Sequence, residues 1–162
     1  DAVRYFAAEI WPLVRRQLPG AVFFVLGSNP PAEVLSLNGD GITVVGYVEQ
    51  LPPYFNRCRL SVAPLRYGAG IKGKIATSLG FGVPCVATRT AVEGMGLTDG
   101  RETLVADSPQ AFADAVVRVY SEESLWLSLS DQGLQFLERE MSLTVGREKL
   151  RAMLVHLNVL VG

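Results

Sequence analysis

The sequence predicts an α/β fold of the Rossmann-like kind, in which helices flank a parallel sheet. Short apolar runs alternate along the chain with longer segments of helical periodicity. Strands that alternate with helices are expected to run parallel and to be joined by right-handed crossovers. Residues 21–26 are apolar at every position, as expected of a strand that is covered on both faces.

The elements can be placed by periodicity and by their end signals. Apolar residues three and four positions apart, including Val3, Phe6, Ile10 and Val14, predict a helix over residues 2–18 that ends at a Pro-Gly pair. Strands are expected at residues 21–26, 42–45, 60–63, 84–88 and 103–105, and further helices at 51–57, 71–81, 109–120, 122–138 and 143–160.

Length and composition limit the class of protein. The chain has 162 residues, of which 49% are hydrophobic and 19% charged, so we expect one folded domain over residues 1–162. A net charge of -1 gives no electrostatic basis for general nucleic-acid binding. No apolar run reaches the ~18 residues that span a membrane. With Cys58 and Cys85 expected as reduced thiols, a cytoplasmic location is predicted.

The carboxyl ends of the expected strands share a chemical signature. In a parallel sheet these ends lie at one edge, where ligands bind. Gly27, Gly46 and Gly68 each follow a strand, and glycine lets a ligand approach the backbone closely. Any one of them could simply make a turn, but together they indicate a binding edge. Arg66, at the same edge, either contacts a phosphate or pairs with a carboxylate.

The loop Tyr-Gly-Ala-Gly-Ile-Lys-Gly-Lys at residues 67–74 carries the clearest chemical signal. It follows a strand, holds three glycines and opens a helix. A helix N-terminus presents unpaired N–H groups and a partial positive charge, which suit a phosphate or diphosphate. Lys72 or Lys74 would add a full positive charge.

Two other phosphate-binding motifs fit this loop less well. Gly68 to Lys74 matches G-x-x-x-x-G-K, but Ile75 stands where a P-loop NTPase needs Ser or Thr for magnesium. Gly68, Gly70 and Gly73 match the dinucleotide spacing, yet no acidic residue ends the next strand. An NTPase and an NAD(P) enzyme are therefore disfavoured. We expect no cofactor and, without a Cys–His cluster, no metal site.

Several segments resemble the C-terminal domain of group 1 glycosyltransferases of the retaining GT-B type. They are VFFVLG, APLRYGAGIKGK and GFGVPCVAT, and the likeness extends over nearly the whole chain. In that family two Rossmann-like domains face each other across a cleft, and the C-terminal one binds the nucleotide-sugar donor. The resemblance implies transfer of a sugar from a nucleoside diphosphate sugar to an acceptor.

The resemblance also assigns donor contacts by position. Gly46, Val48 and Leu51 would line the nucleobase pocket, and Thr77 would face the ribose. The stretch beside the diphosphate and the donor sugar would be residues 68–72, which include Gly68, Gly70, Ile71 and Lys72. No residue is assigned as catalytic.

The sequence departs from the family pattern at two positions. The family often has two glutamates where this chain has Ala69 and Thr77. A threonine hydroxyl can hydrogen-bond a ribose, but it offers no carboxylate. The alternative is therefore a degenerate, non-catalytic module of the same fold that serves as a scaffold or binds a partner.

The family domain normally begins with a strand ahead of the helix at residues 2–18. We expect the chain to be a fragment that lacks this strand and an N-terminal domain, which would hold the acceptor and any peripheral membrane contact. Loss of the strand would leave unpaired strand edges. The chain is then expected either to pair the neighbouring strands or to self-associate.

Overall fold

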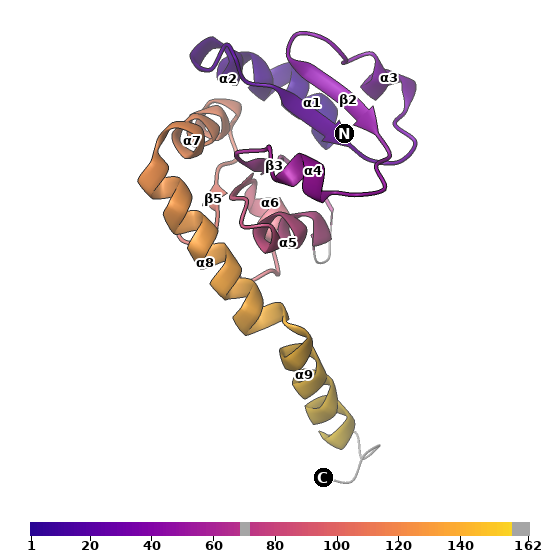
Figure 1. Cartoon of the computed structure of the whole chain (residues 1–162), viewed down its shortest axis with the longest axis vertical. Helices are drawn as coiled ribbons and strands as arrows, with labels where there is room; N and C mark the ends of the chain where they lie inside the picture. The colour runs from indigo at the N-terminus through magenta and orange to yellow at the C-terminus, as the bar shows by residue number, and fades with distance from the viewer. Residues whose placement is uncertain (69–71, 157–162) are drawn as a thin grey trace.

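The computed structural model describes residues 1–68 and 72–156, and it is an α/β fold with parallel strands (Figure 1). All five expected strands are present. The short helices α3 and α6 were not expected. In chain order the elements are α1 Ala2–Tyr5, η1 Phe6–Ile10, α2 Trp11–Gln17, β1 Phe23–Leu26, α3 Ala32–Leu35, β2 Ile42–Gly46, α4 Pro52–Phe55, β3 Ser61–Ala63, α5 Gly73–Gly80, β4 Cys85–Ala87, α6 Arg89–Val92, β5 Leu104–Val105, α7 Pro109–Ser121, α8 Glu123–Met141 and α9 Leu143–His156.

The first helical segment is interrupted by a π-helical turn, η1, between α1 and α2. Pro12 lies in the first turn of α2. Proline has no N–H, so it cannot donate to the carbonyl four residues earlier. The helix therefore takes a π-helical turn before Pro12, and a new α-helix, α2, begins at Trp11. A missing N–H donor is tolerated in the first turn of a helix. The sequence predicts one continuous helix here, and that prediction is wrong in this detail.

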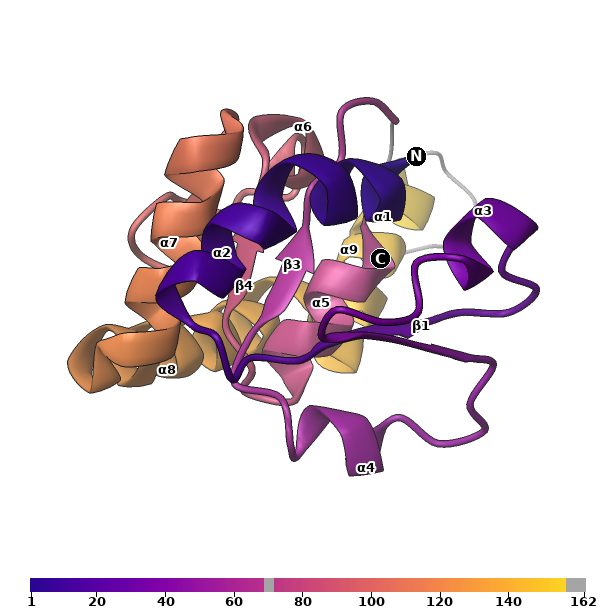
Figure 2. The ribbon, with the colours of Figure 1, turned by 90° about the horizontal axis from the view of Figure 1, so that it is seen from above.

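The strands form two separate parallel sheets. One contains β1 and β2, and the other has the order β3-β4-β5. β3 and β4 lie side by side while β1 lies apart from them (Figure 2). The expectation that β1 and β3 close the gap by pairing is therefore wrong for the part of the chain that the structure describes. Self-association stays a prediction.

Side chains, rather than backbone hydrogen bonds, hold the two sheets together. One hydrophobic cluster combines Val25 of β1 and Ile42 of β2 with Val86 of β4 and Phe112 of α7. Phe6 is 1% exposed, and its ring centroid lies 4.6 Å from that of Phe23 and 6.1 Å from that of Phe112. Fully burying one such side chain stabilises the fold by about 1.5–3 kcal/mol.

A second cluster lies beneath β3 and β4 and fixes α5. Ile75 and Leu79 of α5 pack against Cys85 and Ala87 of β4. Helix α8 crosses α5 at Gly133, where an added Cβ would stand 2.9 Å from a methyl carbon of Leu79. This close approach holds α5 against the body of the domain.

Helix α9 projects away from the sheets at the end of α8 (Figure 1). Leu143, Leu150 and Met153 are exposed on it. The predicted extent of this helix to residue 160 ends outside the described residues. Among the described residues, no helix combines the length and the apolar character needed to cross a membrane.

Candidate functional site

The carboxyl ends of β1 and β2 are joined at two glycines. The Gly27 N–H donates to the Gly46 carbonyl at 2.8 Å. Gly46 has φ +81, a left-handed conformation that favours glycine. An added Cβ at either glycine would meet nothing within 4 Å. The two predicted residues therefore lie together at an open position of the edge.

The segment after β2 presents apolar surface beside these glycines. Tyr47 is 72% exposed and Leu51, which precedes α4, is 36% exposed. Val48 is half-buried between them. An exposed aromatic ring and branched side chains suit the flat face of a nucleobase.

The start of α5 is available to an anion. Lys72 occupies the N-cap position without a side-chain cap on the helix, and the first turn carries no acidic residue. Ile75 N–H donates to the Lys72 carbonyl at 2.9 Å, so the N–H groups ahead of it belong to the open first turn. Among the described residues, an added Cβ at Gly73 would meet nothing within 4 Å, which leaves room beside this part of the backbone.

Two lysines flank this helix start. The Lys72 ammonium donates to the Gly68 carbonyl at 3.1 Å, and Gly68 has φ +126. Lys74, in the first turn of α5, is exposed. The structure thus places the Lys72 ammonium against the Gly68 carbonyl, with Lys74 two residues further along the chain. Gly70 and Ile71, like Ala69, lie outside the described residues.

Arg66 precedes the glycine loop in the sequence, and Thr77 follows it in α5. The Arg66 guanidinium pairs with the carboxylate of Asp1, through a 2.9 Å bond from Nε and a second bond from its terminal nitrogen. It also lies 4.9 Å from the centre of the Tyr5 ring. Of the two roles left open for Arg66, the structure therefore shows the carboxylate pairing. Thr77 is half-buried in α5.

Thr88 holds the segment ahead of the glycine loop, a role that sequence reasoning did not assign. The side chain of Thr88 is buried, and its hydroxyl donates to the Leu65 carbonyl at 2.6 Å. The same oxygen accepts from the Ala91 N–H at 3.3 Å and caps α6. Thr88 therefore ties the end of β4 to the chain that leads into the glycine loop. A threonine just before a short helical stretch is a typical N-cap signal.

The described residues form no side-chain cluster at this edge that could hold a metal ion. Among residues 1–68 and 72–156, no group of three His, Cys, Asp or Glu side chains could hold a metal ion. The chemistry that the site offers is instead positive. The helix start and two ammonium groups can hold and neutralise a diphosphate.

Parallel strands, glycine-lined strand ends and a basic helix start define a half-domain of the Rossmann-like α/β class. Residues 1–122 match the sequence model of the family described as glycosyl transferases group 1. The chain therefore belongs to the group 1 glycosyl transferases. No curated protein sequence matches it.

Solved structures share the fold at low sequence identity. Sucrose-phosphate synthase (tll1590) from Thermosynechococcus elongatus matches 98% of the chain with a TM-score of 0.78 and 19% identity. Anabaena Alr3699/HepE, in complex with UDP and glucose, matches 89% with a TM-score of 0.75 and 11% identity. The C-terminal domain of a group 1 family protein (LpcC) from Francisella tularensis matches 88% with a TM-score of 0.69 and 14% identity.

The chain corresponds to one part of these larger proteins. It spans 42% of the sucrose-phosphate synthase chain and 43% of the HepE chain. Against the LpcC C-terminal domain it spans 79%. The fold predicted from the sequence, one Rossmann-like half of a GT-B architecture, is confirmed by these likenesses.

Proposed function

We propose that this domain binds a nucleoside diphosphate sugar and serves as the donor half of a sugar transferase. The observation that carries the proposal is the uncapped start of α5, with Lys72 and Lys74 beside it and no acidic residue in its first turn. A diphosphate is the ligand whose charge and size suit this arrangement. The parent enzyme would move the sugar to an acceptor with retention of configuration.

The remaining contacts follow from the geometry of the edge. Val48 and Leu51 offer apolar surface to the nucleobase. Gly27 and Gly46 leave open backbone beside it. Thr77 is half-buried in α5, and its hydroxyl would contact the adjoining ribose.

The positive charges also have a role in the reaction. Breaking the sugar–phosphate bond leaves negative charge on the departing diphosphate. Donors that are already aimed at that position stabilise the transition state more than the ground state. The first turn of α5 and the lysine ammonium groups would supply this stabilisation. The acceptor would be held by a second, N-terminal domain, which would also carry any peripheral membrane contact. We further propose a cytoplasmic location.

A panel of nucleotides tests donor binding. The domain is titrated by calorimetry with UDP, GDP, ADP, dTDP and ATP, each with and without magnesium. UDP is the first ligand to try, because the structural relative HepE is described in complex with UDP and with UDP-glucose. We expect saturable, magnesium-insensitive binding of one nucleoside diphosphate. Binding of ATP that requires magnesium would overturn the proposal and favour an NTPase.

A non-catalytic module of the same fold is the second candidate. Thr77 favours it, because this threonine stands where the resemblance places a glutamate. Under this alternative none of the five nucleotides binds, with or without magnesium. The same titration of a longer chain that includes a second domain distinguishes lost chemistry from an incomplete site.

A further inference from the structure

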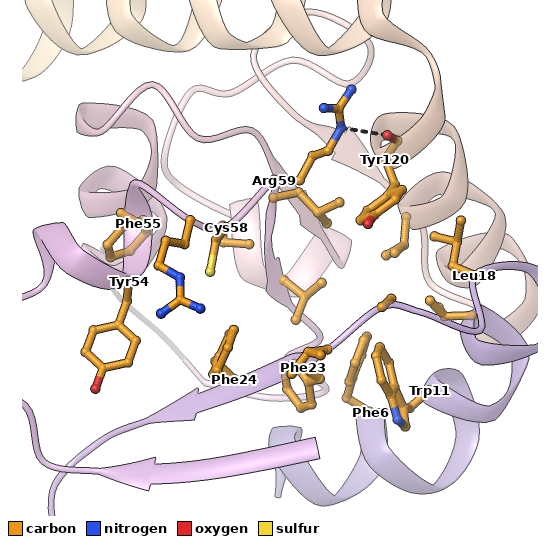
Figure 3. Close-up of a pocket in the computed structure, with 18 of the residues that line it drawn as sticks. Phe6, Trp11, Leu18, Phe23, Phe24, Tyr54, Phe55, Cys58, Arg59 and Tyr120 are labelled. Carbon is orange, nitrogen blue, oxygen red and sulfur yellow. Dashed lines mark hydrogen bonds between the residues drawn. The ribbon is translucent and has the colours of Figure 1, made fainter. Parts of the chain in front are cut away.

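The two ends of β3 are tied to the rest of the domain in different ways. At the amino end, in the wall of a pocket of about 550 Å³, the guanidinium of Arg59 donates from Nε to the Tyr120 carbonyl at 2.7 Å (Figure 3). The Trp126 indole N–H donates to the Arg59 carbonyl, so this end is anchored on α7 and α8. The carboxyl end leads instead toward the glycine loop and α5.

The segment that follows β3 has left the β3–β4 ladder. The register of this pair ends with Ala63 opposite Ala87. Pro64 has no N–H to donate, and the Leu65 N–H turns back to the Ala63 carbonyl at 3.0 Å. Because Leu65 and the residues after it lie beyond the strand pairing, side-chain contacts set where this segment runs.

Thr88 holds both the end of β3 and the segment beyond it. Its N–H donates to the Ala63 carbonyl at 3.2 Å, and its hydroxyl donates to the Leu65 carbonyl at 2.6 Å. The hydroxyl oxygen also accepts from the Ala91 N–H at 3.3 Å, in the first turn of α6. Thr88 is 4% exposed, so little water competes for these bonds.

A threonine suits this position for two physical reasons. Its hydroxyl both donates and accepts, and both capacities are used here. The branched Cβ restricts χ1, which keeps the hydroxyl aimed at the Leu65 carbonyl. Valine has the same branched shape but would deprive that carbonyl of this donor, whereas serine keeps the hydroxyl with a freer χ1.

The next residue, Arg66, is held by weaker contacts. Its guanidinium pairs with Asp1 and lies 4.9 Å from the centre of the Tyr5 ring. The side chains of Arg66 and Asp1 are 51% and 27% exposed, and exposed ion pairs contribute little to stability because solvent screens them. The buried bond from Thr88 is therefore the firmer of the two attachments.

Leu65 is connected to the Lys72 ammonium through a short stretch of chain. The Gly68 carbonyl accepts from this ammonium at 3.1 Å, and Lys72 is the N-cap residue of α5. A shift of Leu65 would therefore move the acceptor that orients one of the two lysines at the helix start. With Leu65 fixed, this part of the site is ordered on folding, and binding does not carry that entropic cost.

We propose that Thr88 is a positioning residue of the candidate donor site, whose hydroxyl raises the affinity for the diphosphate through Leu65 and Gly68 without touching the ligand. This role rests on the donor function proposed above. The effect should be asymmetric, because the surface assigned to the nucleobase follows β2, which belongs to the other sheet. Loss of the hydroxyl should weaken the hold on the phosphates and leave the hold on the base unchanged.

Three variants separate positioning from general stability. Thr88→Val removes the hydroxyl, and Thr88→Ser restores it. The matched control is Thr103→Val, because the Thr103 hydroxyl is also buried and also donates at 2.6 Å to a backbone carbonyl, that of Cys85 at the opposite end of β4. Binding of UDP is measured by calorimetry and binding of uridine by chemical-shift titration. Backbone order parameters are measured at residues 65–67.

Thr88→Val should weaken UDP binding by about tenfold, the size expected for a lost hydrogen bond, while the affinity for uridine changes by less than about twofold. The order parameters at residues 65–67 should fall from the range of rigid backbone toward about 0.6. Thr88→Ser should recover most of the UDP affinity. Thr103→Val should unfold at a lower urea concentration, yet keep the UDP affinity and the order parameters of the unchanged chain.

Two results would overturn the proposal. Equal losses of UDP and uridine affinity in Thr88→Val would mean that Thr88 supports the domain as a whole. Unchanged order parameters in that variant would mean that the hydroxyl does not fix the segment, whether or not UDP binds. If the unchanged chain binds no nucleotide, the donor function itself fails, and the order parameters alone decide whether Thr88 holds this segment.

Discussion

The amide of Gly27 donates a 2.8 Å hydrogen bond to the carbonyl of Gly46, and this bond joins the carboxyl ends of β1 and β2. Two segments that are far apart in the sequence thereby form one open position at the ligand edge. The two glycines serve it differently. Gly46 holds a left-handed conformation with φ +81, whereas no such conformation is found at Gly27.

The first prediction compares these two glycines. Gly46→Ala should lower the free energy of unfolding by about 1–2 kcal/mol, because a Cβ disfavours the left-handed conformation. Gly27→Ala is the matched control and should change stability little, since its Cβ would meet nothing within 4 Å. Urea unfolding of both variants measures the difference. Equal stabilities would mean that the turn after β2 relaxes without strain.

The second prediction concerns the lysines at the start of α5. Lys72→Ala and Lys74→Ala should each weaken binding of a nucleoside diphosphate by about 10- to 100-fold, the usual effect of losing a charged hydrogen bond. Lys149→Ala is the control, because Lys149 lies on α9 and pairs with Glu140. Calorimetry gives the three dissociation constants. Loss of affinity in the Lys149 variant alone would move the site away from α5.

The third prediction separates the donor domain from the degenerate module. Thr77→Glu should tighten nucleotide binding by a few-fold to about tenfold, because a carboxylate accepts two ribose hydroxyls where a threonine offers one oxygen. Thr77→Gln keeps the length without the charge and should have a smaller effect. If Thr77→Glu weakens binding more than Thr77→Gln does, the ribose does not lie at this position.

The fourth prediction uses the cysteines. Burial raises the pKa of the Cys85 thiol from 9.0 to about 11. The unfolded chain therefore loses this proton at lower pH than the folded chain does. The contribution of the protonated Cys85 thiol to the free energy of unfolding is fully present below pH 9. It is lost as the pH rises toward 11, and the total loss is about 2–3 kcal/mol.

Unfolding measured between pH 8 and 11 checks this dependence. Cys85→Ala should have a lower overall stability and a flatter profile. Burial also raises the pKa of Cys58, but that thiol is half-buried. Alkylation at pH 9 should therefore modify Cys58 while Cys85 stays intact. Equal modification of the two thiols would show that β4 opens readily.

The strands and long helices were predictable because their signals are local. Residues 21–26 are apolar throughout and contain β1, and the glycine at residue 82 ends α5 with φ +66. The helices α3 and α6 have four residues each, which is too short for periodicity to show. The π turn depends on how Pro12 is accommodated, and no apolar pattern reports that.

The site was predictable in composition but not in its contacts. Glycines and lysines that follow the strands in the sequence indicated a ligand-binding edge at the carboxyl ends of the strands. Asp1 and Arg66 form a pair although they are 65 residues apart in the sequence. The hydrogen bond from Thr88 to Leu65 depends on the pairing of β4 with β3. Such contacts are set by tertiary structure, so no local sequence signal could reveal them.

The division into two sheets also bears on how the domain unfolds. Hydrogen-bonded ladders transmit local opening along a sheet, whereas packed side chains can separate more gradually. The β1–β2 pair is held to the rest through the cluster around Phe6 and Phe112. It should therefore behave as its own cooperative unit, whose amides exchange at lower denaturant concentration than those of β3, β4 and β5. The second cluster, around Leu79, would then be the last part of the molecule to melt.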